Sequence, residues 1–391
     1  MKNSQSLDTL CAALAGVMGI EAPAQAAAPC EALTAYAAEK LEGRKADRVF
    51  MYNPDAIAQW VYTKYAGLMK EAIDRTELQV PFCTVMPSVT PVCFGTMYTG
   101  AQPEVHGIQA YVKPVIAIDT IFDALIRAGK KPAIVCTAGD SLAKIYLERN
   151  MDYFFYPTVE EVNAKAAQLI LEDKHDFIVV YNGNYDTVMH KYGTESVEAL
   201  SELRDNSHAF GMFDALIQNC WKQHDTLVGF CMDHGCHDID GGCGSHGLDM
   251  EEDLNIVHLF KAHLAQEKML HDMKLHAEPF SMILSGRKTY ELRLWDEKRQ
   301  QITPGDRIRF TCSDDPTRQF TASVRALHRF PDFAALYKAL PLEACGYLPE
   351  ELETASPADM ALYYSPEQQA KYGVVAIELS LDSKSILSNH K

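Results

Sequence analysis

Side chains that can bind metal ions or take part in phosphoryl transfer recur along the sequence, just after short apolar runs that are typical of β-strands. Carboxylates and imidazoles follow three of these runs, and a threonine hydroxyl follows a fourth. The residues are Asp55, Thr90, Asp186, His190, Asp233, His234 and, slightly further on, His246. Ligands of open α/β sheets bind beyond the carboxyl ends of the strands, so we expect these side chains to meet at one sheet edge.

The carboxylates and histidines divide into two candidate metal-binding sets. Asp186 and His190 are four residues apart and would share one face of a helical turn, and His246 completes an Asp/His/His set. Oxygen and imidazole ligands of this kind suit zinc or manganese. An Asp-His pair after a strand is on its own more often a turn or a cap, so the prediction depends on the whole constellation. The second set is Asp55, Asp233 and His234.

Thr90 stands where an expected strand ends and a helix opens at Pro91. Backbone N–H groups and the helix dipole favour an anion at such a position. A threonine hydroxyl is a weak nucleophile at its ordinary pKa, and a bound metal ion can activate it. Two metal ions about 4 Å apart can also clamp a phosphoryl group during in-line displacement. These residues therefore predict metal-dependent phosphoryl transfer.

The elements that must position these residues alternate between strands and helices over residues 46–260. The expected strands are 48–53, 80–86, 132–137, 177–181 and 226–232. The expected helices are 56–75, 117–128, 142–150, 159–173, 196–223 and 249–268. Alternation of this kind predicts an α/β fold with a mostly parallel sheet covered by helices.

The same residues resemble the motifs of type I phosphodiesterase/nucleotide pyrophosphatases, which belong to the alkaline phosphatase superfamily. The resemblance covers about residues 46–260, and all seven expected ligand positions are filled. The matching segments are Pro87-Ser88-Val89-Thr90, Thr99-Gly100 through Pro103 to His106-Gly107-Ile108, Asp186-x-x-x-His190-x-x-Gly193, Asp233-His234-Gly235 and Gly244-Ser245-His246-Gly247.

The resemblance implies a fold, a nucleophile and two divalent metal ions. The superfamily fold is a doubly wound sheet flanked by helices. Thr90 would be the nucleophile and would form a phosphothreonine intermediate. The metal ions would be zinc, with manganese as an alternative. One would be held by the set that contains Asp186, and the other by the Asp55 set together with the Thr90 oxygen.

The substrate class is less sharply predicted. The resemblance places a substrate contact three residues after the nucleophile, where nucleotide pyrophosphatases have asparagine and this chain has Cys93, a much weaker donor. A phosphodiesterase or nucleotide pyrophosphatase is our first interpretation. A phosphonate hydrolase or a phosphomonoesterase on the same site is an alternative. A second alternative is an RNA-binding or regulatory protein that retains a silent phosphatase fold.

The C-terminal part carries a different pattern. Gly286, Lys288, Glu291 and Arg293 form a Gly-x-Lys-x-x-Glu-x-Arg motif within residues 285–299. This motif resembles that of ASCH domains, which are small α+β β-barrels related to the PUA fold, and the resemblance covers roughly residues 272–382.

If residues 289–294 form a strand, Glu291 and Arg293 point to one face, beside Lys288. The resemblance implies that these three residues bind RNA or a nucleotide, and Trp295 could stack on a base. Some small ASCH proteins are amidohydrolases that have threonine where this chain has Glu291, so binding is favoured over catalysis. A purely structural ion-paired strand face is the alternative.

We therefore expect two domains, residues 1–267 and 268–391. The first would be the phosphodiesterase domain, with an amphipathic helix at residues 6–20 docked on it. The second would be the ASCH domain, with further strands at 307–312, 321–327 and 373–381.

Composition limits the partners. The formal net charge is −17, and the acidic excess lies in residues 1–267, whereas residues 274–329 are basic. An acidic body repels bare polyanions unless metal ions bind to it. The 11 cysteines lack framework spacing, which indicates reduced thiols. No apolar run approaches the roughly 18 residues that span a bilayer. We expect a cytoplasmic protein without membrane partners that acts on a small phosphate ester or nucleotide, with RNA as a partner of the ASCH domain.

Overall fold

The structure is a computed structural model that describes residues 1–266 and 268–381. It divides into two compact units, Met1–Ala265 and Gln266–Lys391. Residue 267, at the expected domain boundary, and residues 382–391, at the end of the expected second domain, lie outside the described residues. No helix of the described part of the chain combines the length and the apolar composition needed to cross a membrane.

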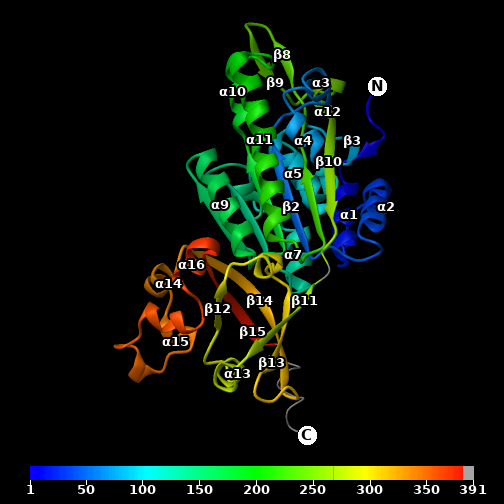
Figure 1. Ribbon diagram of the computed structural model, residues 1–391. Coiled ribbons are helices and arrows are strands. Elements are labelled where there is room, and N and C mark those ends of the chain that lie inside the picture. Colours follow the sequence, from blue (N-terminus) through cyan, green and yellow to red (C-terminus); the bar gives the residue numbers. More distant parts are fainter. Residues whose placement is uncertain (267, 382–391) are drawn as a thin grey trace. The chain divides into compact units, whose positions relative to one another are not determined.

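The first unit is built on an eight-stranded sheet with the strand order β1-β3-β10-β7-β2-β6-β4-β5 (Figure 1). All strands run in the same direction except β10, which is antiparallel to both of its neighbours. The strands are β1 Gln5–Ser6, β2 Arg48–Pro54, β3 Leu78–Cys83, β4 Pro132–Thr137, β5 Asp152–Tyr156, β6 Phe177–Asn182, β7 Thr226–Phe230 and β10 Asn255–His263. The sheet is therefore mostly parallel, as the alternation of elements predicted.

Helices cover both faces of this sheet. Crossovers between parallel strands are right-handed, so the direction in which the chain moves along the sheet decides which face a connecting helix covers. One group of helices packs together and comprises α4 Lys70–Asp74, α9 Val159–Glu172 and α11 Val197–Cys220. The other group comprises α1 Thr9–Met18, α2 Glu31–Lys40, α5 Thr90–Thr99, α7 Ile121–Arg127 and α8 Leu142–Ile145. Because both faces are covered, β2, β6 and β7 are buried almost throughout. The fold is thus a doubly wound α/β sheet.

The sequence interpretation was wrong at residues 249–268, which were expected to form one helix. The structure has the single turn α12 Glu251–Leu254 followed directly by strand β10. An apolar run without a clear period fits a buried helix as well as a buried strand. Here the neighbouring strands favour a strand, because residues 255–263 hydrogen-bond to β3 on one side and to β7 on the other. Asn255 pairs with Cys83, and Leu259 pairs with Phe230. The expected helix 56–75 is also two shorter helices, α3 Gln59–Lys64 and α4.

Three further short elements belong to the unit. These are α6 Pro103–His106, α10 Asn184–Tyr192 and the hairpin of β8 His237–Ile239 with β9 Cys243–Ser245. Helix α10 follows β6 after a single glycine, and the hairpin follows β7. Both elements therefore continue from neighbouring regions of the sheet's carboxyl edge.

The second unit is a curled five-stranded sheet with the order β11-β13-β14-β15-β12. Its edge strands β11 and β12 are not paired with each other, so the sheet is a half-barrel rather than a closed ring. The strands are β11 Leu270–Leu275, β12 Tyr290–Leu294, β13 Arg307–Cys312, β14 Gln319–Phe330 and β15 Val374–Leu381. The helices are α13 Ala277–Leu284, α14 Phe333–Ala339, α15 Leu342–Cys345 and α16 Pro366–Tyr372, with 3-10 turns at Arg299–Gln301, Pro349–Glu351 and Pro357–Leu362. Phe280 of α13 and Phe333 of α14 anchor two separate apolar clusters.

Candidate metal centre and ASCH pocket

The carboxyl ends of three adjacent strands supply most of the candidate ligands. Strand β2 lies between β6 and β7 in the sheet. Asp55 follows β2, Asp186 lies in the first turn of α10 after β6, and Asp233 follows β7. Parallel neighbours end at the same sheet edge, which brings these three carboxylates to one place.

The first group of candidate ligands comes from α10 and from the residue after β9. Asp186 Oδ1 lies 3.3 Å from His190 Nε2 and 3.4 Å from His246 Nε2. The two Nε2 atoms of these histidines are 3.1 Å apart. Each residue offers one ligand atom, and the three atoms lie within 4.8 Å of one another, a spacing that can hold a metal ion.

The second group is deeply buried and includes the candidate nucleophile. His234 Nε2 lies 3.3 Å from Asp55 Oδ1 and 3.4 Å from Asp233 Oδ2. Thr90 Oγ1 lies 3.4 Å from both Asp55 Oδ2 and His234 Nε2. The rings of His234 and His246 stack at 4.1 Å between centroids, so the two groups are direct neighbours.

The three histidines are held in the tautomer that a metal ligand requires. Each Nδ1 lies within 3.0 Å of a backbone carbonyl, which can only accept, so Nδ1 carries the proton. The carbonyls belong to Gly244 for His190, Gly235 for His234 and Ser88 for His246. Each Nε2 therefore faces the carboxylates and is the ring atom that can bind a metal ion, in exchange for any proton that it carries.

Three buried carboxylate oxygens in the cluster accept no hydrogen bond. They are Asp55 Oδ1, Asp186 Oδ1 and Asp233 Oδ2. An unpartnered buried carboxylate is costly unless a cation pairs with it. The donor set of oxygens and imidazole nitrogens fits divalent zinc or manganese, so the residues present suit the metal ions that the sequence motifs imply.

The pKa values describe the same shortage of positive charge. Burial, with repulsion from neighbouring aspartates, raises the pKa of Asp55 well above its ordinary value and that of Asp233 to about 7. Burial also lowers the pKa of His234 to about 3. Asp186 differs, because its two neighbouring histidines outweigh burial and lower its pKa, and this carboxylate raises the pKa of His190 to about 9.

Two glycines of the motifs stand where a larger residue would collide with neighbouring atoms. A Cβ at Gly235 would lie 2.0 Å from the Glu252 carbonyl oxygen. A Cβ at Gly244 would lie 2.5 Å from Met189 Sδ and 2.9 Å from the Met189 carbonyl oxygen. Only glycine allows these backbone approaches, which set the chain directions on either side of His234 and His246.

Helix α5 carries Thr90, the candidate nucleophile, and Cys93. Thr90 is the first residue of α5, and its side chain is buried. Cys93, the expected substrate contact, is fully buried in the same helix, and burial raises the pKa of its thiol well above the ordinary value. The side chain of Cys93 thus has no exposed surface to offer a ligand.

Sequence reasoning missed Tyr181, whose hydroxyl donates to Asp55 Oδ2. It also missed the backbone role of Ser88, which orients His246. Tyr181 lies near the carboxyl end of β6, and that position is the only sequence signal that could have drawn attention to it. No pattern indicates that its hydroxyl reaches a carboxylate from another strand.

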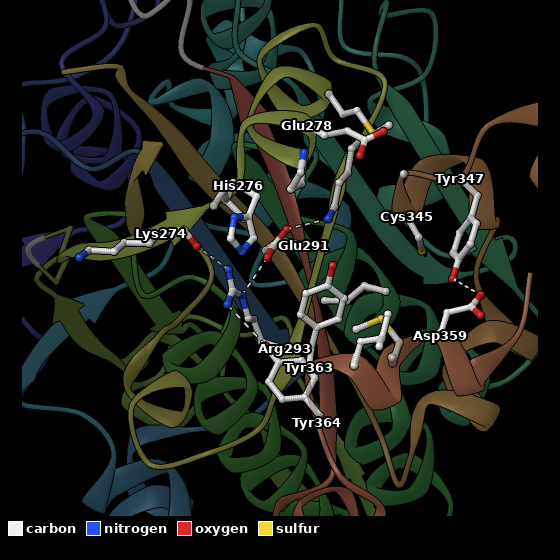
Figure 2. A pocket seen from close by; sticks show the side chains of 18 of the residues that line it. Lys274, His276, Glu278, Glu291, Arg293, Cys345, Tyr347, Asp359, Tyr363 and Tyr364 are labelled. Carbon is white, nitrogen blue, oxygen red and sulfur yellow. Dashed lines mark hydrogen bonds and ion pairs between the residues drawn. The ribbon is translucent and has the colours of Figure 1, made fainter. Parts of the chain in front are cut away.

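In the second unit, Lys288, Glu291 and Arg293 line a pocket of about 470 Å³ (Figure 2). Glu291 is buried, with Oε2 2.9 Å from Lys288 Nζ and Oε1 2.8 Å from Arg293 Nε. These two cations outweigh burial and hold the pKa of the Glu291 carboxyl below its ordinary value. All three side chains expected from the motif therefore meet in one ion-paired group.

Another part of the pocket lining is tyrosine-rich and comes from residues 337–364. Tyr337 and Tyr347 share a hydrogen bond of 2.7 Å, and Tyr347 donates to Asp359 over 3.0 Å. Tyr363 is 63% exposed and also lines the pocket. Trp295, which was expected to stack on a base, is not among the lining residues and packs against the apolar core beneath the Arg329 guanidinium.

Comparisons with family models and with solved structures each match only part of the chain. The family model of the ASCH domain matches residues 273–382. The crystal structure of hypothetical protein PH0355 is 30% identical, with 29% of this chain and all of that chain covered and a TM-score of 0.25. The human ectonucleotide pyrophosphatase/phosphodiesterase 5 is 16% identical, with 49% of this chain and 58% of that chain covered and a TM-score of 0.40. No curated protein matches the chain. From the family match, residues 273–382 of this chain are an ASCH domain.

Proposed function

We propose that the first unit is a metal-dependent phosphohydrolase that cleaves phosphodiesters, with Thr90 as its nucleophile. The observation that carries this proposal is the juxtaposition of two candidate metal-ligand groups, one of which contacts the Thr90 hydroxyl at 3.4 Å. The motif resemblance to type I phosphodiesterases supports the same reaction.

Two divalent cations, most favourably zinc, would be held by the residues of these groups. Asp186, His190 and His246 would hold one. Asp55, Asp233 and His234 would hold the other, beside Thr90. When bound, the ions supply Lewis acidity, which activates a hydroxyl and stabilises charge that develops on phosphoryl oxygens.

The protein's own groups would carry the reaction in two displacements. Thr90 Oγ1 attacks phosphorus as the bond to the leaving alcohol breaks, and its proton can pass to Asp55 Oδ2, the carboxylate oxygen that it already faces. Tyr181 holds this carboxylate in place. Water then attacks the phosphothreonine, which restores Thr90 and releases a phosphomonoester. The N-terminus of α5 favours the negative charge at Thr90.

The test is hydrolysis of bis(4-nitrophenyl) phosphate and of 4-nitrophenyl phosphate, with and without chelator. We expect the wild-type protein to cleave the diester faster, and chelation or Thr90→Ala to abolish cleavage. Thr63→Ala, which removes an exposed threonine of α3, is the matched control and should retain full activity. Faster cleavage of the monoester would be compatible with Thr90 as nucleophile, but it would make the substrate a phosphomonoester. Cleavage that persists in Thr90→Ala would contradict the assignment.

A phosphonate substrate is the alternative reaction for the same residues. If neither nitrophenyl ester turns over while metal binds, phosphonoacetate cleavage, followed by phosphate release, would identify it. A silent phosphatase fold would bind no metal and cleave none of these compounds.

For the second unit we propose nucleotide or RNA binding rather than amide hydrolysis. The supporting observation is the pocket of Figure 2, which offers a buried carboxylate as acceptor, a lysine as donor and tyrosine rings as a wall. A nucleobase needs donors and acceptors at its edge together with an apolar or aromatic contact for its face. Calorimetric titration of the full chain with the four nucleosides tests it. At least one should bind, and Glu291→Gln should weaken that binding, whereas Glu367→Gln, on the exposed start of α16, should not.

A further inference from the structure

A second cavity, which no part of the proposed functions uses, adjoins the ASCH pocket. Its volume is about 630 Å³. Five of its lining residues are basic and one is acidic, and we call it the basic groove. The lining residues are Asp272, Met273, Lys274, Arg293, Lys298, Arg299, Arg309, Thr311 and Gln319.

The fold explains why so many charged residues meet here. Strands β11 and β13 are parallel neighbours, and Asp272 pairs in register with Arg309 while Lys274 pairs with Thr311. The intervening residues Met273 and Phe310 are buried in the core. Strand alternation therefore directs the polar side chains of both strands to the outer face of the half-barrel.

The positive charge of the groove is not balanced from within it. Arg309 binds the only lining carboxylate, Asp272, through two contacts of 2.7 and 3.0 Å. Arg299 pairs with Asp296, and its Nε is buried without a hydrogen-bond partner. Among the described residues, Lys274 Nζ and Lys298 Nζ make no hydrogen bond or close ion pair. Two lysines and an unpartnered guanidinium N–H therefore remain to bind an anion.

The basic groove shares two lining residues with the ASCH pocket. Lys274 and Arg293 line both cavities, and Arg293 Nη2 donates to the Lys274 carbonyl over 2.9 Å, which ties the two open sheet edges together. Figure 2 shows Lys274 and Arg293 on the side of the pocket away from Tyr347 and Asp359. One ligand could thus place a base against the tyrosine-rich wall and an anionic group on the basic side.

We propose that the basic groove is the phosphate subsite of a phosphorylated nucleoside whose base occupies the ASCH pocket. Lysine ammonium groups and arginine forks are the usual phosphate donors, and charge-assisted hydrogen bonds are stronger than neutral ones. The phosphate can belong to a free nucleotide or to a nucleotide within an RNA strand, since the chemistry recognised is the same. This inference rests on the proposed nucleotide binding of the pocket.

The experiment compares the four nucleosides with their 5′-monophosphates by calorimetry on the full chain at low salt. The preferred monophosphate should bind about tenfold more tightly than its nucleoside, the ratio expected for a hydrogen bond to a charged group. Lys298→Met should remove most of this ratio without changing nucleoside affinity, and Lys298→Arg should restore it. Lys338→Met, an exposed lysine of α14 outside both cavities, is the matched control and should keep the ratio.

Equal affinity for nucleoside and monophosphate in the wild-type protein would overturn the phosphate subsite and leave nucleoside binding standing. Absence of binding by any of these compounds would instead refute the proposed function of the pocket. An equal decrease of the monophosphate-to-nucleoside affinity ratio in Lys298→Met and Lys338→Met would also overturn the subsite, because it would indicate an effect of long-range charge alone. A tetranucleotide without terminal phosphate that binds as tightly as the monophosphate, with the same sensitivity to Lys298→Met, would support the subsite with an RNA strand as the source.

Discussion

The candidate metal centre and the ASCH pocket both enclose buried carboxylates, but they balance the negative charge differently. In the pocket, Lys288 and Arg293 pair with Glu291 and lower its pKa. In the metal centre, Asp55 and Asp233 have no lysine or arginine partner within the described residues, and their pKa values are raised. In the pocket the chain supplies both charges, whereas the candidate metal centre leaves buried carboxylate oxygens that bound cations would balance. This difference is why we propose catalysis with metal for one and ligand binding for the other.

The largest expected effect that tests this contrast is on activity. His190→Ala removes one ligand of the first group and should lower diester hydrolysis by about 10³-fold or more, because several kcal/mol of transition-state stabilisation depend on the bound ion. His208→Ala removes an exposed histidine of α11 that pairs with Glu71, and it should leave the rate unchanged. Initial rates at saturating zinc measure both variants. Similar rates for the two variants would contradict the assignment of His190.

The next effect is an opposite change of stability in the two units. In chelated protein, Asp233→Asn removes a charge that burial disfavours and should raise the unfolding free energy of the first unit by about 2 kcal/mol. Glu291→Gln leaves Lys288 and Arg293 without their partner and should lower that of the second unit by about 2 kcal/mol.

Hydrogen exchange in increasing urea, read separately for peptides of each unit, measures both changes of unfolding free energy. Changes of the same sign would remove the electrostatic distinction between the metal centre and the pocket. Added zinc should reverse the first effect, because the wild-type carboxylate then has its cation.

A smaller effect is expected from the tyrosines that contact the two sites. Tyr181→Phe removes the hydrogen bond to Asp55 and should weaken zinc binding about tenfold, as loss of a group that orients a ligand does. Tyr364→Phe removes only a long contact of 3.5 Å to Arg293 and should change nucleotide affinity less than twofold. Zinc titration and nucleotide titration give the two values. A loss of nucleotide affinity of about tenfold in Tyr364→Phe, as large as the expected loss of zinc affinity in Tyr181→Phe, would show that Arg293 depends on Tyr364 for its position.

The meeting of the candidate metal ligands at one sheet edge was predictable from the sequence, because each position relative to its strand is a local property. Asp55 follows β2 directly and Asp233 comes three residues after the end of β7, so the sheet itself brings them together. Tyr181 and the Ser88 carbonyl were not predictable, since their contacts cross between elements that are distant in sequence. Strand β10 was missed for a related reason. Residues 255–263 have no local preference that excludes a helix, and their pairing with β3 and β7, which are distant in sequence, makes them a strand.

In the second unit, too, contacts between residues close in sequence were predictable, whereas contacts between distant segments were not. The lysine, glutamate and arginine of the motif are close in sequence and meet in the structure as a strand would place them. The tyrosine-rich wall comes from residues 337–364, outside the motif, and no pattern linked it to the pocket. Trp295 lies two residues after Arg293, the last residue of the motif. Its ring is partly buried and packs against the apolar core, where it gains apolar contacts.

Zinc titration of the chelated full-length protein tests the central claim most directly. Calorimetry should find two equivalents of tightly bound zinc for each chain, and Asp186→Asn should reduce the number to one, because that residue belongs to only one ligand group. Absence of zinc binding by the wild-type protein would contradict the account, since the buried carboxylates would then have no cation to explain them.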